Sequence, residues 1–170
     1  MPILPTFEPK SNKSHMTKEH IYQNLLPQIK ALIEGEDDAV SVMANISAAL
    51  REAMSFFWVG FYVVHGSELH LGPFQGSVAC YRIHYGKGVC GTAWQRAETI
   101  IVDDVEQFPG HIACSSLSRS EIVVPVKNAS GEVTAVLDID STELSSFDAT
   151  DRYWLEQITA LLGLYIKKEE

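Results

Sequence analysis

Three cysteines, Cys80, Cys90 and Cys114, are the residues of this sequence best suited to chemistry. A thiolate is both a nucleophile and a metal ligand. Cys114 falls in a long loop expected over residues 103–118, and loops carry function more often than packing, so it is the best single candidate for a reactive thiol. Cys90 lies near the start of a short helix expected over Val89–Ala97, where the helix dipole would lower its pKa. The alternative for Cys90 is a small buried side chain on a packed helix.

The sequence leaves the pairing of these thiols open. Three cysteines cannot form a closed disulfide framework, and in a reducing compartment they rest as thiols, which leaves catalysis, metal binding or packing as their role. A disulfide between Cys80 and Cys114 requires Cα atoms about 4.4–6.8 Å apart, a condition that their spacing alone does not test.

Two carboxylates occupy alternate positions of a strand expected over Val133–Asp140. Asp138 and Asp140 therefore point to the same face of the sheet. If residues 128–131 form a four-residue hairpin loop, counting back along the strands places Glu121 opposite Asp138, and three acids converge. Because opposed like charges are unfavourable, this arrangement indicates a bound cation or a carboxyl group that keeps its proton. The alternative is that these acids lie at strand ends in water.

Aromatic residues flank a glycine on another expected strand. Trp58, Gly60 and Tyr62 share one face, and together they could form the floor of a ligand pocket whose π-faces accept an onium or methyl group. The alternative is that they belong to the core. The helix that follows Gly88 starts with free backbone N–H groups, which could hold a ligand carboxylate, although this motif is weak.

Two other chemistries have partial sequence support. Cys80 and His84, with His111 and Cys114, give the spacings C-x₃-H and H-x₂-C, which could bind zinc but include no tight C-x₂-C pair. The glycines of residues 86–91 match the dinucleotide spacing G-x-G-x-x-G. A βαβ unit and a ribose-binding acid do not follow, so flavin or nicotinamide binding has little support.

Composition narrows the class of partner. The 170 residues can bury one sizeable core, and 13 Lys and Arg against 22 Asp and Glu give a formal charge of −9 with no basic cluster. This balance argues against nucleic acid or an anionic membrane as partner. The longest apolar run, Phe56–Val64, has nine residues, about half of the ~18 expected of a membrane-spanning helix.

The first sixteen residues differ from the rest of the chain. Prolines occupy positions 2, 5 and 9, and the segment lacks the apolar stretch of a signal peptide. We therefore expect residues 1–16 to form a flexible leader, residues 17–170 to form a single domain, and the protein to be cytoplasmic.

Hydrophobic periodicity and turn residues predict an α+β fold. Strands in hairpin order without full crossover helices favour an antiparallel sheet with helices grouped on one side. We expect helices over residues 17–34, from 37, over 89–97 and over 148–167, and strands over residues 56–64, 68–74, 80–84, 99–102, 121–127 and 133–139.

Five segments together resemble one family. They are Phe57–Tyr62, Gly88–Ala93, His111–Cys114, Ser120–Pro125 and Val136–Ser141. The chain from about Thr17 onward is similar to the free methionine-(R)-sulfoxide reductases, an enzymatic branch of the GAF domains. The resemblance implies a GAF-like six-stranded antiparallel sheet with helices on one side and a ligand cavity on the other.

The resemblance also assigns roles to the cysteines. It implies that Cys114 is the attacking thiol, that Cys80 is the resolving thiol and that Cys90 is auxiliary. Helix-terminus physics alone would favour Cys90 as the nucleophile, so only the resemblance moves this role to Cys114. A sulfenic acid and then an intramolecular disulfide would form, and thioredoxin would restore the thiols without a bound cofactor or metal.

The remaining site residues follow in the same way. Glu121, Asp138 and Asp140 match the acids that line the substrate cavity, and Trp58 matches the aromatic that meets the sulfoxide methyl group, with Tyr62 on the same face. The implied partners are free methionine-(R)-sulfoxide and thioredoxin, with a homodimer left open. The alternative function is a non-catalytic GAF sensor of a small ligand or of redox state, since fold alone does not imply function.

Overall fold

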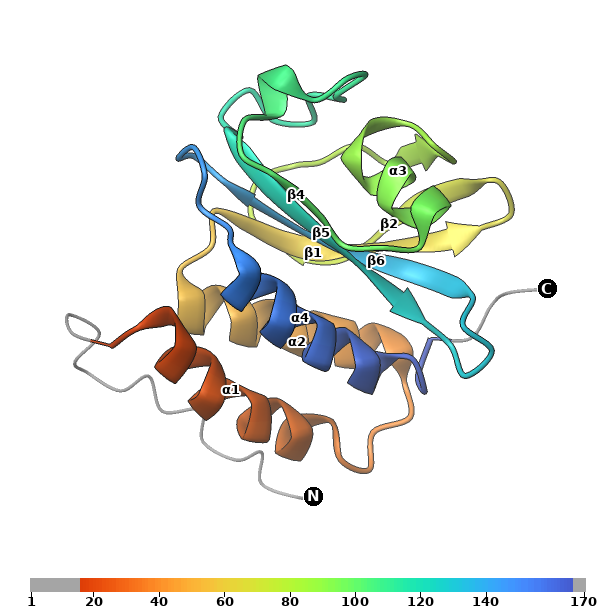
Figure 1. Cartoon of the computed structure of the whole chain (residues 1–170). Helices are drawn as coiled ribbons and strands as arrows, with labels where there is room; N and C mark the ends of the chain where they lie inside the picture. The colour runs from red at the N-terminus through yellow and green to blue at the C-terminus, as the bar shows by residue number, and fades with distance from the viewer. Residues whose placement is uncertain (1–15, 167–170) are drawn as a thin grey trace.

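The computed structural model describes residues 16–166 as a twisted antiparallel sheet with helices on both faces (Figure 1). The sheet has six strands, as expected, and their order is β3-β2-β1-β6-β5-β4. The expected leader falls almost entirely outside the described residues and stays a prediction. The elements are α1 (Lys18–Ile33), α2 (Ala39–Met54), β1 (Trp58–His65), β2 (Glu68–Gln75), β3 (Arg82–His84), α3 (Gly88–Arg96), β4 (Ile100–Val102), η2 (Val105–Gln107), β5 (Ser120–Lys127), β6 (Val133–Ser141) and α4 (Ala149–Leu162).

Side-chain caps begin the long helices where the sequence predicts. Thr17 accepts a hydrogen bond from the backbone N–H of His20, and Asp38 accepts one from the backbone N–H of Ser41. Asp148 and Asp151 form a reciprocal capping box at the start of α4. Helix α4 ends at Leu162, earlier than the expected end at residue 167, and the residues that follow form a turn.

The main hydrophobic core lies between the sheet and the three helices α1, α2 and α4. Side chains at alternate positions of the central strands, such as Phe61, Ile122 and Leu137, are fully buried against these helices. The helix α1 belongs to the same core, and its Tyr22 hydroxyl donates a 2.8 Å hydrogen bond to Asp151 in α4. No helix among residues 16–166 is long and apolar enough to cross a membrane.

The opposite face of the sheet carries a second, smaller core beneath α3. Figure 1 shows α3 on this face, across the sheet from the other three helices. The expectation that all helices group on one side is therefore wrong for α3. Its residues Val89, Cys90 and Ala93 pack with Tyr62 and Val123 of the strands, so α3 forms one wall of the cavity described below.

The pairing of β5 with β6 corrects the predicted register. Glu121 lies opposite Asp140, and Val123 lies opposite Asp138, because the connecting loop is longer than four residues and a bulge follows Val126. The net shift is two residues. Since side chains alternate with a period of two, an even shift keeps all three acids on the predicted face.

Candidate active site

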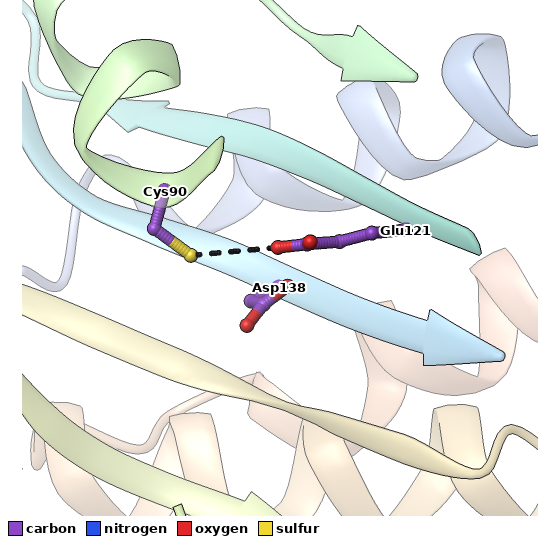
Figure 2. Close-up of side chains that lie close together, drawn as sticks. All are labelled: Cys90, Glu121 and Asp138. Carbon is purple, nitrogen blue, oxygen red and sulfur yellow. Dashed lines mark hydrogen bonds between the residues drawn. The ribbon is translucent and has the colours of Figure 1, made fainter. Parts of the chain in front are cut away.

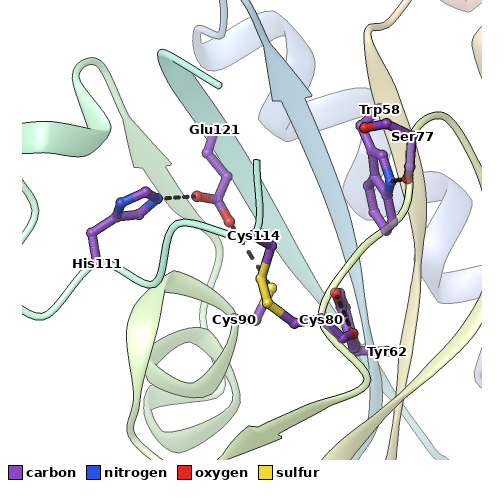
Figure 3. The surroundings of a disulfide bond; sticks show 8 residues. All are labelled: Trp58, Tyr62, Ser77, Cys80, Cys90, His111, Cys114 and Glu121. Atoms are coloured by element: carbon purple, nitrogen blue, oxygen red, sulfur yellow. Dashed lines mark hydrogen bonds and ion pairs between the residues drawn. A yellow bond between two sulfur atoms is a disulfide. The ribbon is translucent and has the colours of Figure 1, made fainter. Parts of the chain in front are cut away.

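A disulfide between Cys80 and Cys114 bridges two irregular segments above the sheet (Figure 3). Cys80 precedes β3, and the expected strand over 80–84 begins only at Arg82. Cys114 lies in the loop between η2 and β5, as predicted. Their Cα atoms are 5.4 Å apart, within the range that a disulfide needs. Both residues are half-buried, so the bond is reachable from solvent.

A cavity lies between this disulfide, α3 and the sheet. Its walls include every residue that the sequence proposes for the site except Cys80, whose sulfur is bonded to the wall residue Cys114. The lining residues are Trp58, Tyr62, Val78, Ala79, Ile83, Gly88, Val89, Cys90, His111, Ile112, Cys114, Ser115, Ser118, Glu121, Asp138 and Asp140. The fold thus gathers residues of β1, α3, β5, β6 and both cysteine segments around one cavity.

Trp58 and Tyr62 belong to the second hydrophobic core and also line the cavity. The two sequence interpretations, core residues and pocket floor, therefore both apply to this aromatic floor. Trp58 stacks with Tyr62 and with Phe74, with ring centroids 6.1 and 5.2 Å apart. The Trp58 indole N–H donates to the carbonyl of Ser77, and the Tyr62 hydroxyl donates to the carbonyl of Cys80. The floor therefore holds the segment that carries Cys80 in place.

Glu121 and Asp138 meet Cys90 in the buried end of the cavity (Figure 2). The Cys90 thiol donates to Glu121 Oε1 at 4.0 Å, and one donor atom from each of the three residues lies within 4.8 Å of the others. Asp138 Oδ1 is buried without a hydrogen-bond partner among the described residues. A buried polar atom without a partner is costly, so this end of the cavity suits a cationic or hydrogen-bond-donating ligand.

Burial and mutual repulsion raise the pKa values of the three acids. The pKa of Glu121 rises well above its usual value through burial and then through the carboxylates of Asp138 and Asp140. Burial and Asp138 similarly raise the pKa of Asp140, against a hydrogen bond with Ser118. Burial also raises the pKa of Asp138, but only to about 6, because hydrogen bonds with Glu121 and Cys90 lower this pKa and oppose the effect of burial. The site thus holds a carboxyl proton beside a carboxylate near neutral pH.

Cys90 does not have the reactive character predicted from its place in the helix. It is 3% exposed, and burial followed by the charges of Asp138 and Glu121 raises the pKa of its thiol well above the usual value. The dipole of a nine-residue helix is outweighed by desolvation and two nearby acids. The alternative of a small buried side chain describes Cys90 better.

His111 lines the cavity, although the sequence suggested it only as a possible zinc ligand and not as a residue of the substrate site. Its Nε2 lies 4.0 Å from Glu121 Oε2, and its side chain is 17% exposed. Burial lowers the pKa of His111, which favours the neutral imidazole. The one sequence signal for a position of His111 in the substrate site is that it lies three residues before Cys114.

The zinc set read from the sequence does not assemble as such. The sulfurs of Cys80 and Cys114 are bonded to each other, and His84 contacts Glu68 on the sheet edge, with Nδ1 3.2 Å from the carboxylate. Among residues 16–166, the side chains of Cys90, Glu121 and Asp138 have ligand atoms close enough together to hold a metal ion, within 4.8 Å of one another.

Comparisons with known proteins identify the architecture. The GAF domain family model matches residues 35–167. This chain belongs to the GAF domain family. It is 57% identical over 147 residues to GAF domain-containing protein A of Dictyostelium discoideum, covering 86% of this chain and 92% of that protein. It is 43% identical over 158 residues to the free methionine-R-sulfoxide reductase of Saccharomyces cerevisiae, covering 88% of each.

A solved structure extends this likeness to the fold of an enzyme. The free methionine-R-sulfoxide reductase of Neisseria meningitidis, determined in complex with its substrate, is 49% identical, with a TM-score of 0.85 over 88% of this chain and 90% of that one. The resemblance to the reductase branch of the GAF family is therefore confirmed.

The glycine run of this GAF domain serves packing and turns. Gly86 and Gly88 have positive φ angles of 73° and 60°, which favour glycine. A Cβ on Gly91 would collide with the backbone carbonyl of His84, so this position allows α3 to approach β3. With every strand pair antiparallel, the run is not the loop of a dinucleotide-binding βαβ unit.

The GAF cavity is small in this disulfide-bonded form. It encloses about 40 Å³, whereas pockets for small-molecule ligands typically measure roughly 300 Å³ or more. Such a space holds a few waters. A ligand of amino-acid size therefore fits only if residues that line the cavity move.

Proposed function

We propose that this GAF domain reduces free L-methionine-(R)-sulfoxide to methionine, with Cys114 as nucleophile and Cys80 as resolving thiol. The observation that carries the proposal is the Cys80–Cys114 disulfide directly above a cavity that holds three acids and an aromatic floor. Relatives of 43 and 49% identity with the same fold are named for this reaction, one of them in complex with its substrate.

The reaction needs an acid and a thiolate. A sulfoxide sulfur is a weak electrophile until its oxygen is protonated, and Glu121 retains a proton because burial raises its pKa. Attack by the Cys114 thiolate forms an S–S bond to the substrate and breaks its S–O bond. Water then releases methionine and leaves Cys114 as a sulfenic acid. The Cys80 thiol condenses with that group, expelling water and forming the disulfide.

A dithiol reductant must close the cycle. Two electrons and two protons return Cys80 and Cys114 to thiols, and the reductant becomes a disulfide. We take thioredoxin as this reductant and the cytoplasm as the compartment, since a reducing compartment keeps such a cycle running. Residues 17–170 then act as a single catalytic GAF domain.

The charges of the cavity favour a free amino acid over a peptide residue. An ammonium group suits Asp138, whose Oδ1 has no hydrogen-bond partner, and Asp140 beside it. The first backbone N–H groups of α3 can donate hydrogen bonds to the substrate carboxylate. Acetylating the amine would leave a buried carboxylate unpaired, which costs several kcal/mol.

The test is turnover of free methionine-(R)-sulfoxide with dithiothreitol, in parallel with the S epimer and with N-acetyl-methionine-(R)-sulfoxide. We expect methionine only from the free R epimer, with kcat/KM for the acetylated compound lower by on the order of a thousandfold. A non-catalytic GAF sensor would form no methionine from any of the three. Equal rates for the free and acetylated R compounds would reject the roles of Asp138 and Asp140.

A further inference from the structure

The segments around the disulfide differ in charge from the rest of the molecule. Residues 76–90 and 107–120, which we call the disulfide face, contain Arg82, Lys87 and Arg119 and no aspartate or glutamate. The whole chain, in contrast, carries a formal charge of −9. All three cationic side chains are exposed. The two segments that carry the bridged cysteines are therefore positively charged, whereas the chain as a whole is acidic.

The same segments expose apolar side chains. Of the nine large apolar residues that are exposed among residues 16–166, five lie on the disulfide face. They are Val78 at 87% exposure, Tyr81 at 77%, Leu117 at 60%, Tyr85 at 49% and Ile112 at 39%. Tyr81 follows Cys80 directly and Leu117 comes three residues after Cys114, so each bridged segment carries an exposed apolar side chain close in sequence to its cysteine. Clusters of exposed apolar residues mark protein contacts.

We infer that the disulfide face is the docking surface for an acidic protein that carries a dithiol, and that this protein reduces the Cys80–Cys114 bond. Its thiolate attacks one sulfur of the bridge, and the other sulfur leaves as a thiolate that takes up a proton. The second thiol of the partner then displaces the mixed disulfide, so the partner becomes oxidised and both cysteines become thiols. The inference rests on the proposed function only in taking this bond as one that is reduced in each cycle.

A protein partner explains the surface better than a small thiol does. A small thiol needs only access to one sulfur, and the half-buried cysteines already provide that access. Exposed aromatic and aliphatic side chains, in contrast, gain free energy when a partner covers them. The positive charges would speed the approach of an acidic protein and would lose this effect in salt.

The experiment measures reduction of the bond itself, with no sulfoxide present, so its outcome does not depend on the proposed substrate. Full-length protein in its disulfide form is mixed either with thioredoxin, kept reduced by its reductase and NADPH, or with dithiothreitol. The charge variant is Arg82→Glu with Lys87→Glu, and the apolar variant is Tyr81→Ser with Leu117→Ser. Lys30→Glu and Tyr153→Ser, which change exposed residues of α1 and α4, are the matched controls.

Each test variant should lower the rate constant with thioredoxin at least tenfold, and neither should change the rate with dithiothreitol by more than about twofold. The control variants should match the wild type with both reductants. Salt at 0.5 M should slow only the thioredoxin reaction. The inference is wrong if the test variants keep the wild-type rate with thioredoxin, or if both reductants are slowed equally, since the bond itself would then have changed. Loss of a dimer in the apolar variant, with thioredoxin rates unchanged, would assign the surface to a second copy of the chain and also overturn it.

Discussion

Burial decides the chemistry of the individual site residues. Cys90, Glu121 and Asp138 are all buried, with one polar atom of each within 4.8 Å of the others, and the pKa of each is raised. The acids therefore keep protons that exposed carboxyl groups would lose, and the thiol keeps a proton that a helix-terminal thiol would lose. Cys80 and Cys114, half-buried at the mouth of the cavity, have the exposure that exchange chemistry needs.

The two bridged cysteines should fail at different steps. Cys114→Ser should produce no methionine even in a single turnover, because the attacking sulfur is absent. Cys80→Ser should release one equivalent of methionine and then stop, with a persistent sulfenic acid on Cys114 visible by mass spectrometry. Ser116→Ala, an exposed position in the same loop, is the control and should turn over normally. One equivalent of methionine from Cys114→Ser would show that another residue is the nucleophile.

Cys90 should resist alkylation in the disulfide form of the protein. It is then the one free thiol of the three, and its raised pKa leaves little thiolate at pH 8. We expect iodoacetamide to modify it at least about a hundred times more slowly in the native protein than in urea, because only the thiolate reacts and the native thiol is buried. Mass spectrometry counts the adducts. Rapid modification of the native protein would contradict both the burial and the raised pKa.

Helix, strand and loop positions determine what each element contributes to the site. The strands β5 and β6 set the three acids on one face, α3 closes one side, and the two cysteine segments form a cover. A covalent bond holds that cover, because the disulfide joins the segment before β3 to the loop before β5. With a cavity of about 40 Å³, little space remains beneath the cover in this disulfide-bonded form.

Substrate binding should therefore depend on the redox state. We expect Cys114→Ser, which cannot form the bond, to bind free methionine-(R)-sulfoxide in calorimetric titrations. Oxidised wild-type protein should bind it at least about tenfold more weakly, a difference of ~1.4 kcal/mol or more. As a matched comparison, the affinity for methionine, which does not react, is measured with reduced and with reoxidised samples of one wild-type preparation. Equal affinities in the two redox states would show that the bond does not close the cavity.

At the scale of the whole molecule, the acidic cavity opposes folding. The pKa of Asp138 rises from 3.8 to about 6 in the folded protein, so the folded state holds this proton more tightly than the unfolded chain does. The contribution is fully favourable below about pH 4 and is lost as the pH rises through about 6. Functional sites commonly carry such a penalty, which the main core under α1, α2 and α4 offsets.

Removing this carboxyl group should stabilise the protein at alkaline pH. A shift of about two pKa units corresponds to about 3 kcal/mol, so Asp138→Asn should raise the free energy of unfolding by up to that amount at pH 8. The gain should shrink to about 1 kcal/mol at pH 4.5. Urea unfolding at both pH values measures it, with the exposed Asp37→Asn as control. A gain that does not change with pH would show that packing, and not charge, is the cause.

Local sequence signals determined the elements of this fold. The long helices begin within two residues of their predicted starts, each capped by a side chain, and the predicted strands form the six-stranded antiparallel sheet. Alternation also placed Asp138 and Asp140 on one face. The predicted register of β5 against β6 was two residues wrong, yet the face of Glu121 was right, because side-chain direction repeats every two residues.

Contacts between distant segments needed more than local sequence signals. Residue types and spacing left the pairing of Cys80 with Cys114 open, and only the family resemblance implied it. The approach of His111 to Glu121 and the position of α3 beside the acids were decided only by the tertiary structure. The chemistry of Cys90 depended on them most. A helix start lowers the pKa of a thiol in water, but desolvation and two carboxylates from β5 and β6 reverse that effect. Periodicity reports which face a side chain takes, whereas its pKa depends on what the folded chain brings to that face.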